Sequence, residues 1–535
     1  MKKTSFLRNS ALTLALAATV SAPALAQTPP NALVMAWNID AISTFDPAQI
    51  AEVVTDEIYR NACESLVDFD VADESNYVPA LAESWETSED GLTMTFHLRE
   101  GLTFRDGSPA TAGDLAWSMQ RVVRLGFGNA ATLIEYGFTA ANIEQTITAP
   151  DDRTLVLTLD RPYPASLILG SIAANRVASL LDRKVVEANA TGDDLGNAYL
   201  ATRTECVGPY NLVRWNPGEV VMLQANETAG GSRTPGLDQI LIRHVAETGS
   251  QRLLIERGDV DVARNLNAED LADLEQNENI KIETVLKPSM FYLAMNMDHP
   301  ALNDSRVRLA MRYLIDYQGL GETVMRGVGV PRASYVQYPA VGALDLEEGQ
   351  PFSLDLDKAR ELLTEAGYPD GFTATLLIGS HPYGSPIGQA LQETAAQVGI
   401  TLNMERMSNS QLFSRTRGRE FETALLGFGA SIPDAHMMSS RMVFNPDNAA
   451  EANLGQYPSW RSAYFDEDAN ARVEEAMMER DPARRIELYH ALQRDQMENG
   501  PLAFIMQTMD PAALRTTITA YPRNGFRVYY DAVTK

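Results

Sequence analysis

Residues 81–123 constrain the fold of this chain most strongly, because they predict a hairpin followed directly by a helix. Apolar side chains occupy every second position of Thr93–Leu98, which is typical of a half-buried strand. The turn-forming sequences Ser-Glu-Asp-Gly and Arg-Asp-Gly-Ser stand on either side of it. A helix is predicted from Thr111, with Asp114 in its first turn, where the helix dipole favours a negative charge.

The same residues also follow a known pattern, W-x-x-S-x-D-G-x-T-x-T-F-x-L-R-x-G-x-x-F-x-D-G-x-P-x-T-A-x-D. This run resembles the hallmark of the peptide/nickel type of periplasmic solute-binding proteins, the dipeptide/oligopeptide/nickel-binding family 5 of ABC importers. The resemblance implies an α/β fold like that of type II periplasmic binding proteins. It further implies two lobes joined by a hinge, an extra subdomain inserted in the first lobe, and a ligand-binding cleft with no catalytic activity.

The N-terminal sequence predicts export. A basic start precedes an apolar segment at residues 11–20 and an Ala-Leu-Ala cleavage site at residues 24–26, the pattern of a signal peptide covering residues 1–26. The apolar segment is about half of the roughly 20 residues that a membrane-spanning helix needs. We therefore expect a periplasmic protein that is not embedded in the membrane.

Composition adds two constraints. The net charge of −27 argues against nucleic acid and anionic membrane surfaces as partners, since both select basic patches. The two cysteines, Cys63 and Cys206, would enter an oxidising compartment, so a disulfide between them is predicted, with two buried free thiols as the alternative. Their spacing excludes a C-x-x-C zinc or redox motif.

Strand and helix patterns alternate along the chain, which favours α/β lobes. The resemblance continues through G-P-Y-x-L, W-x-P-G-E and L-x-x-N within residues 208–226 and onward toward the C-terminus. It implies these parts after the signal peptide: residues 27–70 and 201–285 of lobe I, an inserted subdomain at 71–200, lobe II at 286–500, and a return to lobe I at 501–535.

In the family the chain crosses twice between lobes, and the candidate crossings here are residues 285–291 and 501–507. Ligand binding would shift an open–closed equilibrium of this hinge. The resemblance implies delivery of the ligand to the permease subunits of an ABC importer with a cytoplasmic ATPase. We expect the receptor to be a monomer without a cofactor.

The loop at residues 427–438 follows an apolar run, so it is predicted to leave a strand end, where open α/β sheets bind ligands. The family pattern here is G-W-x-A-D-Y-x-D-P, and its first Asp pairs with the ligand ammonium in peptide-binding members. Ser431 occupies that position, Phe428 replaces the Trp and Ala435 the Pro. A serine hydroxyl does not neutralise an ammonium group, although Asp434 could do so if the loop turns suitably.

His381 and Tyr383 fall near an Arg-Pro-Tyr of dipeptide-binding relatives, in which the Arg reads the ligand carboxylate. Histidine lacks the bidentate guanidinium fork, so the peptide-binding pattern is altered at a second place. His381 could equally be a solvated loop residue. Tyr383 and Phe428 could stack on a ring-bearing ligand or belong to the core. The predicted ligand is therefore a peptide or a peptide-like, amino-acid-derived solute.

Two alternatives stay open. Asp434-Ala435-His436 resembles the D-P-H of nickel-binding relatives, in which His436 would ligate a metal held by a small chelator, although a structural role fits His436 as well. A secreted hydrolase is the second alternative, and the sequence has no G-x-S-x-G, H-E-x-x-H or P-loop motif. The loop at residues 38–45 should also face the cleft, which makes Asp40 and Thr44 candidate ligand contacts.

Overall fold

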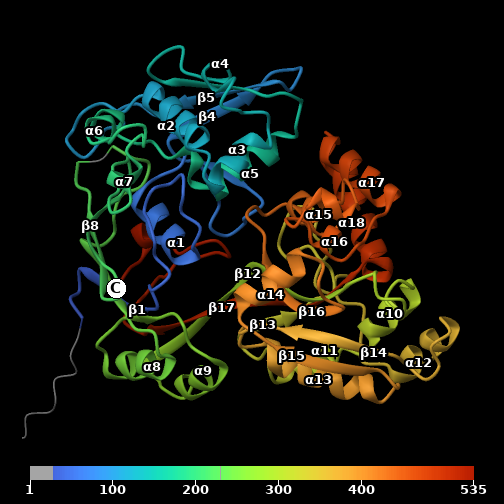
Figure 1. The fold of residues 1–535 in the computed structure, drawn as a ribbon. Helices are drawn as coiled ribbons and strands as arrows, with labels where there is room; N and C mark the ends of the chain where they lie inside the picture. Colours follow the sequence, from blue (N-terminus) through green and yellow to red (C-terminus); the bar gives the residue numbers. More distant parts are fainter. Residues whose placement is uncertain (1–27, 229) are drawn as a thin grey trace, which may run out of the picture.

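The computed structural model describes residues 28–228 and 230–535, so the predicted signal peptide lies outside the described residues. The fold is mixed α/β with two lobes (Figure 1). Lobe I and the inserted subdomain lie on one side of the molecule, lobe II lies on the other, and the strands β12 and β17 run between them. Within the described ranges, no helix is long and apolar enough to cross a membrane.

One 11-stranded sheet runs through both lobes, in the order β15-β14-β16-β12-β17-β11-β1-β10-β9-β8, with β13 paired to β17. The lobe I strands are β1 (Ala32–Trp37), β8 (Tyr210–Asn216), β9 (Val220–Ala225), β10 (Gln239–His244) and β11 (Val262–Ala263). The lobe II strands are β13 (Gly329–Pro331), β14 (Thr373–Ile378), β15 (Thr401–Arg406) and β16 (Thr423–Gly429). The two lobes share β12 (Ile280–Met295) and β17 (Leu502–Arg515).

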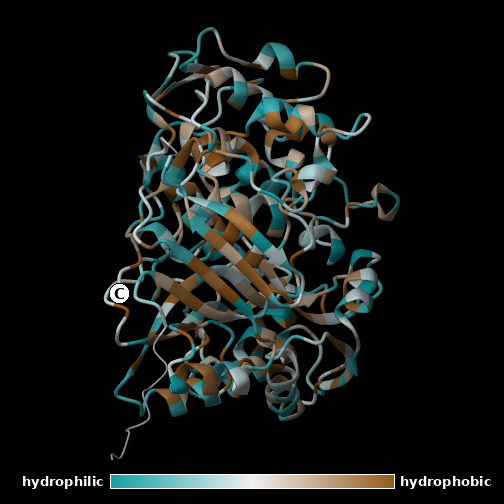
Figure 2. Cartoon of the chain, turned by 90° about the vertical axis from the view of Figure 1, so that its left-hand side faces the viewer, coloured by the Kyte–Doolittle hydropathy of each residue, from teal (hydrophilic) through white to brown (hydrophobic). Residues whose placement is uncertain are grey.

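Helices cover this sheet on each lobe. Lobe I carries α1 (Val53–Ala62), α8 (Thr248–Arg257) and α9 (Ala268–Leu274). Lobe II carries α10 (Ser305–Tyr313), α11 (Tyr317–Glu322), α12 (Leu356–Glu365), α13 (Gly384–Ala396), α14 (Asn409–Arg417), α15 (Ala435–Met442), α16 (Pro458–Arg461), α17 (Glu467–Met478) and α18 (Pro482–Asn499). Seen from the side of lobe I, hydrophobic residues gather on the central strands and the surrounding loops are largely hydrophilic (Figure 2).

The inserted subdomain has its own four-stranded sheet in the order β4-β5-β7-β6, beside a small β2-β3 hairpin. Its strands are β2 (Val67–Phe69), β3 (Tyr77–Pro79), β4 (Ala82–Thr87), β5 (Thr93–Leu98), β6 (Ile147–Thr148) and β7 (Thr154–Thr158). Its helices are α2 (Ala112–Leu125), α3 (Ala131–Ile134), α4 (Ile143–Thr146), α5 (Ala165–Ala174), α6 (Arg183–Ala188) and α7 (Asn197–Leu200). The predicted strand Thr93–Leu98 is confirmed. Thr111 caps α2 through a reciprocal capping box with Asp114.

A buried ion pair fixes the inserted subdomain to lobe I. The guanidinium of Arg121, on α2, contacts both carboxylate oxygens of Asp46 at 2.8 and 2.6 Å, and neither side chain is exposed. Arg121 Nε also donates to the carbonyl of Leu195, and Asp46 accepts from Asn197 Nδ2 at 2.7 Å. The pair is thus surrounded by further hydrogen bonds, as a buried charge pair requires.

Close backbone contacts define the junction between α1 and the inserted subdomain. α1 ends at Ala62, because Cys63 has extended backbone and Glu64 N donates to Val207 O at 2.9 Å. Gly208 allows this close approach, since a side chain there would collide with the carbonyl of Ala62. Cys63 and Cys206 form a disulfide at this point, with their Cα atoms 5.5 Å apart.

The strands β12 and β17 pair along most of their length, but their register shifts between Leu286 and Met290. This irregularity lies at the transition from lobe I to lobe II. The buried Gln507 side chain bridges it, donating from Nε2 to Lys287 O at 2.9 Å and to Tyr338 O at 2.6 Å. Its Oε1 accepts from Tyr338 N at 2.8 Å. One amide group therefore ties both crossing strands to a lobe II loop.

Candidate ligand-binding cleft

A cavity of about 630 Å³ opens where lobe I meets the crossing strands. This volume falls in the range of sites that enclose small-molecule ligands. Its lining residues come from the ends of β1 and β11, the start of α1 and the lobe-connecting parts of β12 and β17: Trp37, Asn38, Asp40, Ala41, Glu52, Val53, Val54, Arg264, Asn265, Lys287, Met509 and Asp510.

The strand arrangement explains why these residues meet. β1 and β11 are parallel neighbours, so their carboxyl ends lie at one edge of the sheet. Asn38 follows β1, and both Arg264 and Asn265 follow β11. The backbone N–H of Asn38 donates to Asn265 Oδ1 at 2.9 Å, which holds the two strand ends together.

Arg264 forms the charged floor of this cavity. Its guanidinium contacts Glu57 at 2.7 and 3.2 Å and Asp510 at 2.9 Å, and it lies over the ring of Trp37 with 4.4 Å to the centroid. Burial alone would lower the pKa of Arg264, but the carboxylates of Glu57 and Asp510 hold that pKa well above its usual value. For Asp510, burial opposes ionisation, but Arg264 and Arg523 keep its pKa below the usual value.

Asp40 and Thr44, both predicted from the loop at residues 38–45, have different surroundings. Asp40 lines the cavity, with its carboxylate 3.3 Å from His244 Nε2. Thr44 is buried, and its hydroxyl accepts from Asp46 N at 3.2 Å. The structure therefore brings Asp40, but not Thr44, to the cavity.

The predicted loops of lobe II follow β14 and β16, which are parallel in the same sheet. His381 lies in the loop after β14. The centroid of its ring is 5.0 Å from that of Phe291 and 4.9 Å from that of Tyr383. Burial lowers the pKa of His381, which favours the neutral ring. Phe428, at the end of β16, is half-buried against the lobe II core. The structure thus places His381, Tyr383 and Phe428 at this strand edge but not in the wall of the cleft cavity.

Ser431 and His436 lie at a second, smaller cavity of about 80 Å³ between the inserted subdomain and lobe II. The subdomain contributes Glu135 and Tyr136 from the region of α3, and α15 contributes Arg441. The Arg441 guanidinium lies 3.9 Å from the Glu135 carboxylate, across the two parts of the molecule. Burial raises the pKa of Glu135 despite this partner.

Asp434 is fully buried and does not supply a free carboxylate to a ligand. Both of its oxygens contact the guanidinium of Arg485, at 2.8 and 2.7 Å. Asp434 Oδ1 also accepts from His436 N at 2.8 Å and so caps α15. Its charge is therefore compensated inside lobe II.

His436 is buried behind this cap, with its Nδ1 3.1 Å from the hydroxyl of Tyr489. Burial lowers its pKa to about 4, and the opposite effect of Asp434 is weakened by Arg485 and Arg441. The neutral imidazole is therefore favoured. Within residues 28–228 and 230–535, no group of three or more His, Cys, Asp or Glu residues could hold a metal ion.

The depressed pKa predicts a pH effect on stability. The unfolded chain takes up a proton at His436 below about pH 6.5, whereas the folded chain does so only near pH 4. The neutral His436 therefore makes its full contribution to the free energy of unfolding above pH 6.5. This contribution, about 3 kcal/mol, is lost as the pH falls toward 4. Urea unfolding at pH 7, 5.5 and 4.5 should therefore show the stability of wild type falling relative to His436→Gln. Parallel pH curves for the two proteins would contradict this expectation.

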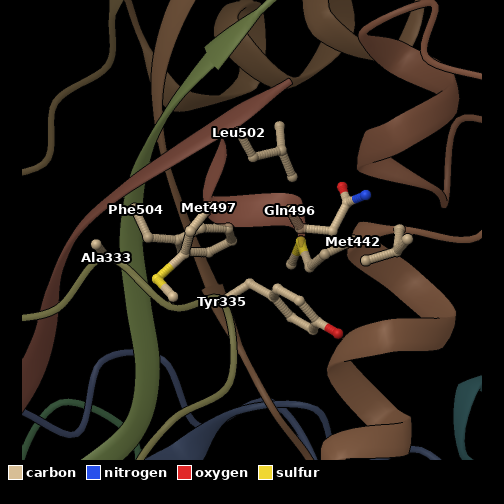
Figure 3. A pocket seen from close by; sticks show the side chains of 8 residues that line it. Ala333, Tyr335, Met442, Gln496, Met497, Leu502 and Phe504 are labelled. Carbon is tan, nitrogen blue, oxygen red and sulfur yellow. The ribbon is translucent and has the colours of Figure 1, made fainter. Parts of the chain in front are cut away.

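A further cavity lies inside lobe II, next to β17, between side chains such as Tyr335, Met442 and Phe504 (Figure 3). Its volume of about 10 Å³ is about that needed for one water molecule. It is a packing void and does not compete with the cleft as a ligand site.

Comparisons with known proteins agree with this architecture. The family described as bacterial extracellular solute-binding proteins, family 5 Middle, matches residues 76–450. A probable D,D-dipeptide-binding periplasmic protein, DdpA of Escherichia coli K12, is 24% identical over 534 residues, covering 98% of this chain and 97% of DdpA. The glutathione-binding protein GsiB of Escherichia coli O1:K1 / APEC is 27% identical over 499 residues, 91% of this chain and 90% of GsiB.

The structure of HbpA2 from Haemophilus parasuis superposes with a TM-score of 0.79 at 21% identity, covering 94% of this chain and 99% of HbpA2. That likeness shows the two-lobe fold of periplasmic binding proteins. The sequence match covers more than half of the chain. The chain therefore belongs to family 5 of the bacterial extracellular solute-binding proteins, and it is a solute-binding protein of the ABC-importer type.

Sequence reasoning missed most of the cavity wall. Glu52, Val53, Lys287 and Asp510 carry no motif, and they meet only because β12 and β17 return beside α1. Arg264 could have been predicted from the sequence, because it directly follows a short strand of the predicted α/β lobe. Parallel strands place ligand-binding residues at their carboxyl ends.

Proposed function

We propose that this chain captures a peptide or another amino-acid-derived solute in the cleft cavity and delivers it to the permease of an ABC importer. The observation that carries the proposal is the 630 Å³ cavity at the junction of lobe I with the crossing strands, in a chain of this family. The ligands named for DdpA and GsiB, D,D-dipeptides and glutathione, support the ligand class. Both kinds of molecule carry an ammonium group and a carboxylate.

The proposed mechanism is closure without catalysis. The receptor acts in the periplasm, as a monomer, after export by its signal peptide. Lobe II rotates about the register shift of β12 and β17, and ligand selects the closed form because only that form contacts it from both sides. The rings of His381 and Tyr383, packed on the buried Phe291, then cover the apolar part of the ligand.

A thermal-shift screen of the secreted protein tests this proposal. The panel holds peptides, amino-acid derivatives, opines, sugars and Ni²⁺-chelates. A peptide or amino-acid derivative at 100 times its Kd should stabilise the fold by about 2.7 kcal/mol, and small-angle scattering should show a smaller radius of gyration. Stabilisation by sugars or Ni²⁺-chelates alone would contradict the proposed ligand class, and binding without compaction would contradict closure.

A further inference from the structure

The charged side chains that line the cleft cavity differ in how far the protein neutralises them. Arg264 and Asp510 form an ion pair at 2.9 Å, and Asp40 lies 3.3 Å from the ring of His244, a partner that carries charge only when it is protonated. In the described part of the chain, by contrast, no oppositely charged group lies within 4.0 Å of the Glu52 carboxylate or the Lys287 ammonium, and Lys287 acts on Asp510 and Glu74 only at longer range. Two charges of opposite sign thus face one cavity without a directly bound partner.

Neutral groups hold the Glu52 carboxylate in place. It precedes α1, and its carboxylate accepts from the hydroxyls of Ser43 at 2.7 Å and Thr55 at 3.2 Å. These hydroxyls fix the carboxylate without cancelling its charge. The next residue, Val53, leaves 63% of its surface exposed, so an apolar contact lies directly beside the carboxylate.

Lys287 lies on β12 within the register shift between the lobes. Its carbonyl is held by Gln507 Nε2 at 2.9 Å, so its backbone is anchored where the chain crosses. The side chain is half-buried and lines the cavity together with Met509. An anionic group bound here would touch the segment that joins the two lobes.

We infer that the cleft ligand is a zwitterion whose ammonium group is bound by Glu52 and whose carboxylate is bound by Lys287. This inference rests on the proposed function of the cleft. Charge-assisted hydrogen bonds at both ends satisfy ligand groups that lose water on closure. Lobe II has Ser431 and neutral His381 where the family pattern has an acid and an arginine. Recognition of the two charged ends has therefore moved to lobe I and the crossing strand.

Matched ligands and variants test the inference by calorimetry. The probes are L-Ala-L-Ala, D-Ala-D-Ala and glutathione, each with its N-acetylated and C-amidated counterpart. For the probe that binds best, each modification should weaken binding to wild type about 10-fold or more. Glu52→Gln should weaken the free probe by a similar factor and leave the N-acetylated probe unchanged. Lys287→Met should weaken binding of the free probe by a similar factor and leave binding of the C-amidated probe unchanged.

Glu361→Gln and Lys358→Met on α12 are matched controls, because they form an exposed ion pair outside the cavity, and neither should change affinity. Circular dichroism melts verify that every variant is folded. If a probe binds wild type but modification and variants leave its affinity unchanged, the inference is wrong and the proposed function stands. If no probe binds wild type while sugars or Ni²⁺-chelates do, both are wrong.

Discussion

Replacing Arg121 by methionine is expected to lower the free energy of unfolding by about 3–5 kcal/mol. The substitution removes the partner of Asp46, whose carboxylate is completely buried and contacts the guanidinium at 2.8 and 2.6 Å. Asn197 Nδ2 and the backbone of Ala48 would still donate to this carboxylate, but they carry no formal charge. An unpaired buried charge therefore remains, and its desolvation accounts for the expected loss.

Urea unfolding at pH 7.5 measures this effect, and Arg153→Met is its matched control. Arg153 lies on the same subdomain and contacts Glu83 and Glu100, but its side chain is 44% exposed. Water screens these pairs, so the control should lose no more than about 1 kcal/mol. The double variant Asp46→Asn/Arg121→Met should be more stable than Arg121→Met alone. Equal losses for Arg121→Met and Arg153→Met would show that the buried pair does not hold the subdomain to lobe I.

Replacing Arg264 by methionine is expected to destabilise the fold by a similar amount, about 3–5 kcal/mol, and to weaken the loss of stability in acid. Arg264 is the common partner of Glu57 and Asp510 beneath the cleft. In wild type the pKa of Asp510 is held low, so its contribution is present above the unfolded pKa and is lost as the pH falls. In the variant, Asp510 loses one of the two cations that lower its pKa, so that pKa should lie closer to its unfolded value. The variant should therefore lose less stability than wild type as the pH falls below about 5.

Unfolding curves at pH 7, 5 and 3.5 measure this difference. Arg264→Lys keeps the positive charge but loses the planar contact with two carboxylates, so it should recover only part of the lost stability. Its loss of stability in acid should lie between those of wild type and Arg264→Met. If Arg264→Met and wild type lose equal stability between pH 5 and 3.5, the low pKa of Asp510 does not depend on this guanidinium.

Local rules predicted the elements of the fold well. Asp304 is a residue type that favours the start of a helix, and its side chain caps α10 by accepting from Arg306 N. Gly367 is the residue type that favours the position after a helix, and it follows α12 with a left-handed φ of +87°. These features depend on a few neighbouring residues, so the sequence contains the information needed to find them.

The environment of the candidate site was harder to predict, because it depends on contacts between distant segments. Asp434 lies within the predicted ligand loop, but Arg485 from α18 neutralises it. Nothing in residues 427–438 indicates that partner. Glu52 and Lys287 are separated by most of lobe I along the chain, yet they line one cavity. Such pairings follow from the topology of the sheet, which motif spacing does not report.

The disulfide between Cys63 and Cys206 has a consequence for proteolysis. The two residues are 143 positions apart, and the inserted subdomain lies almost entirely between them. A protease that cuts once inside this covalent ring opens it but releases no fragment. The nicked protein would migrate as a single chain without reductant and as two pieces with it. A receptor built this way keeps all its parts attached after a first cut between these two cysteines.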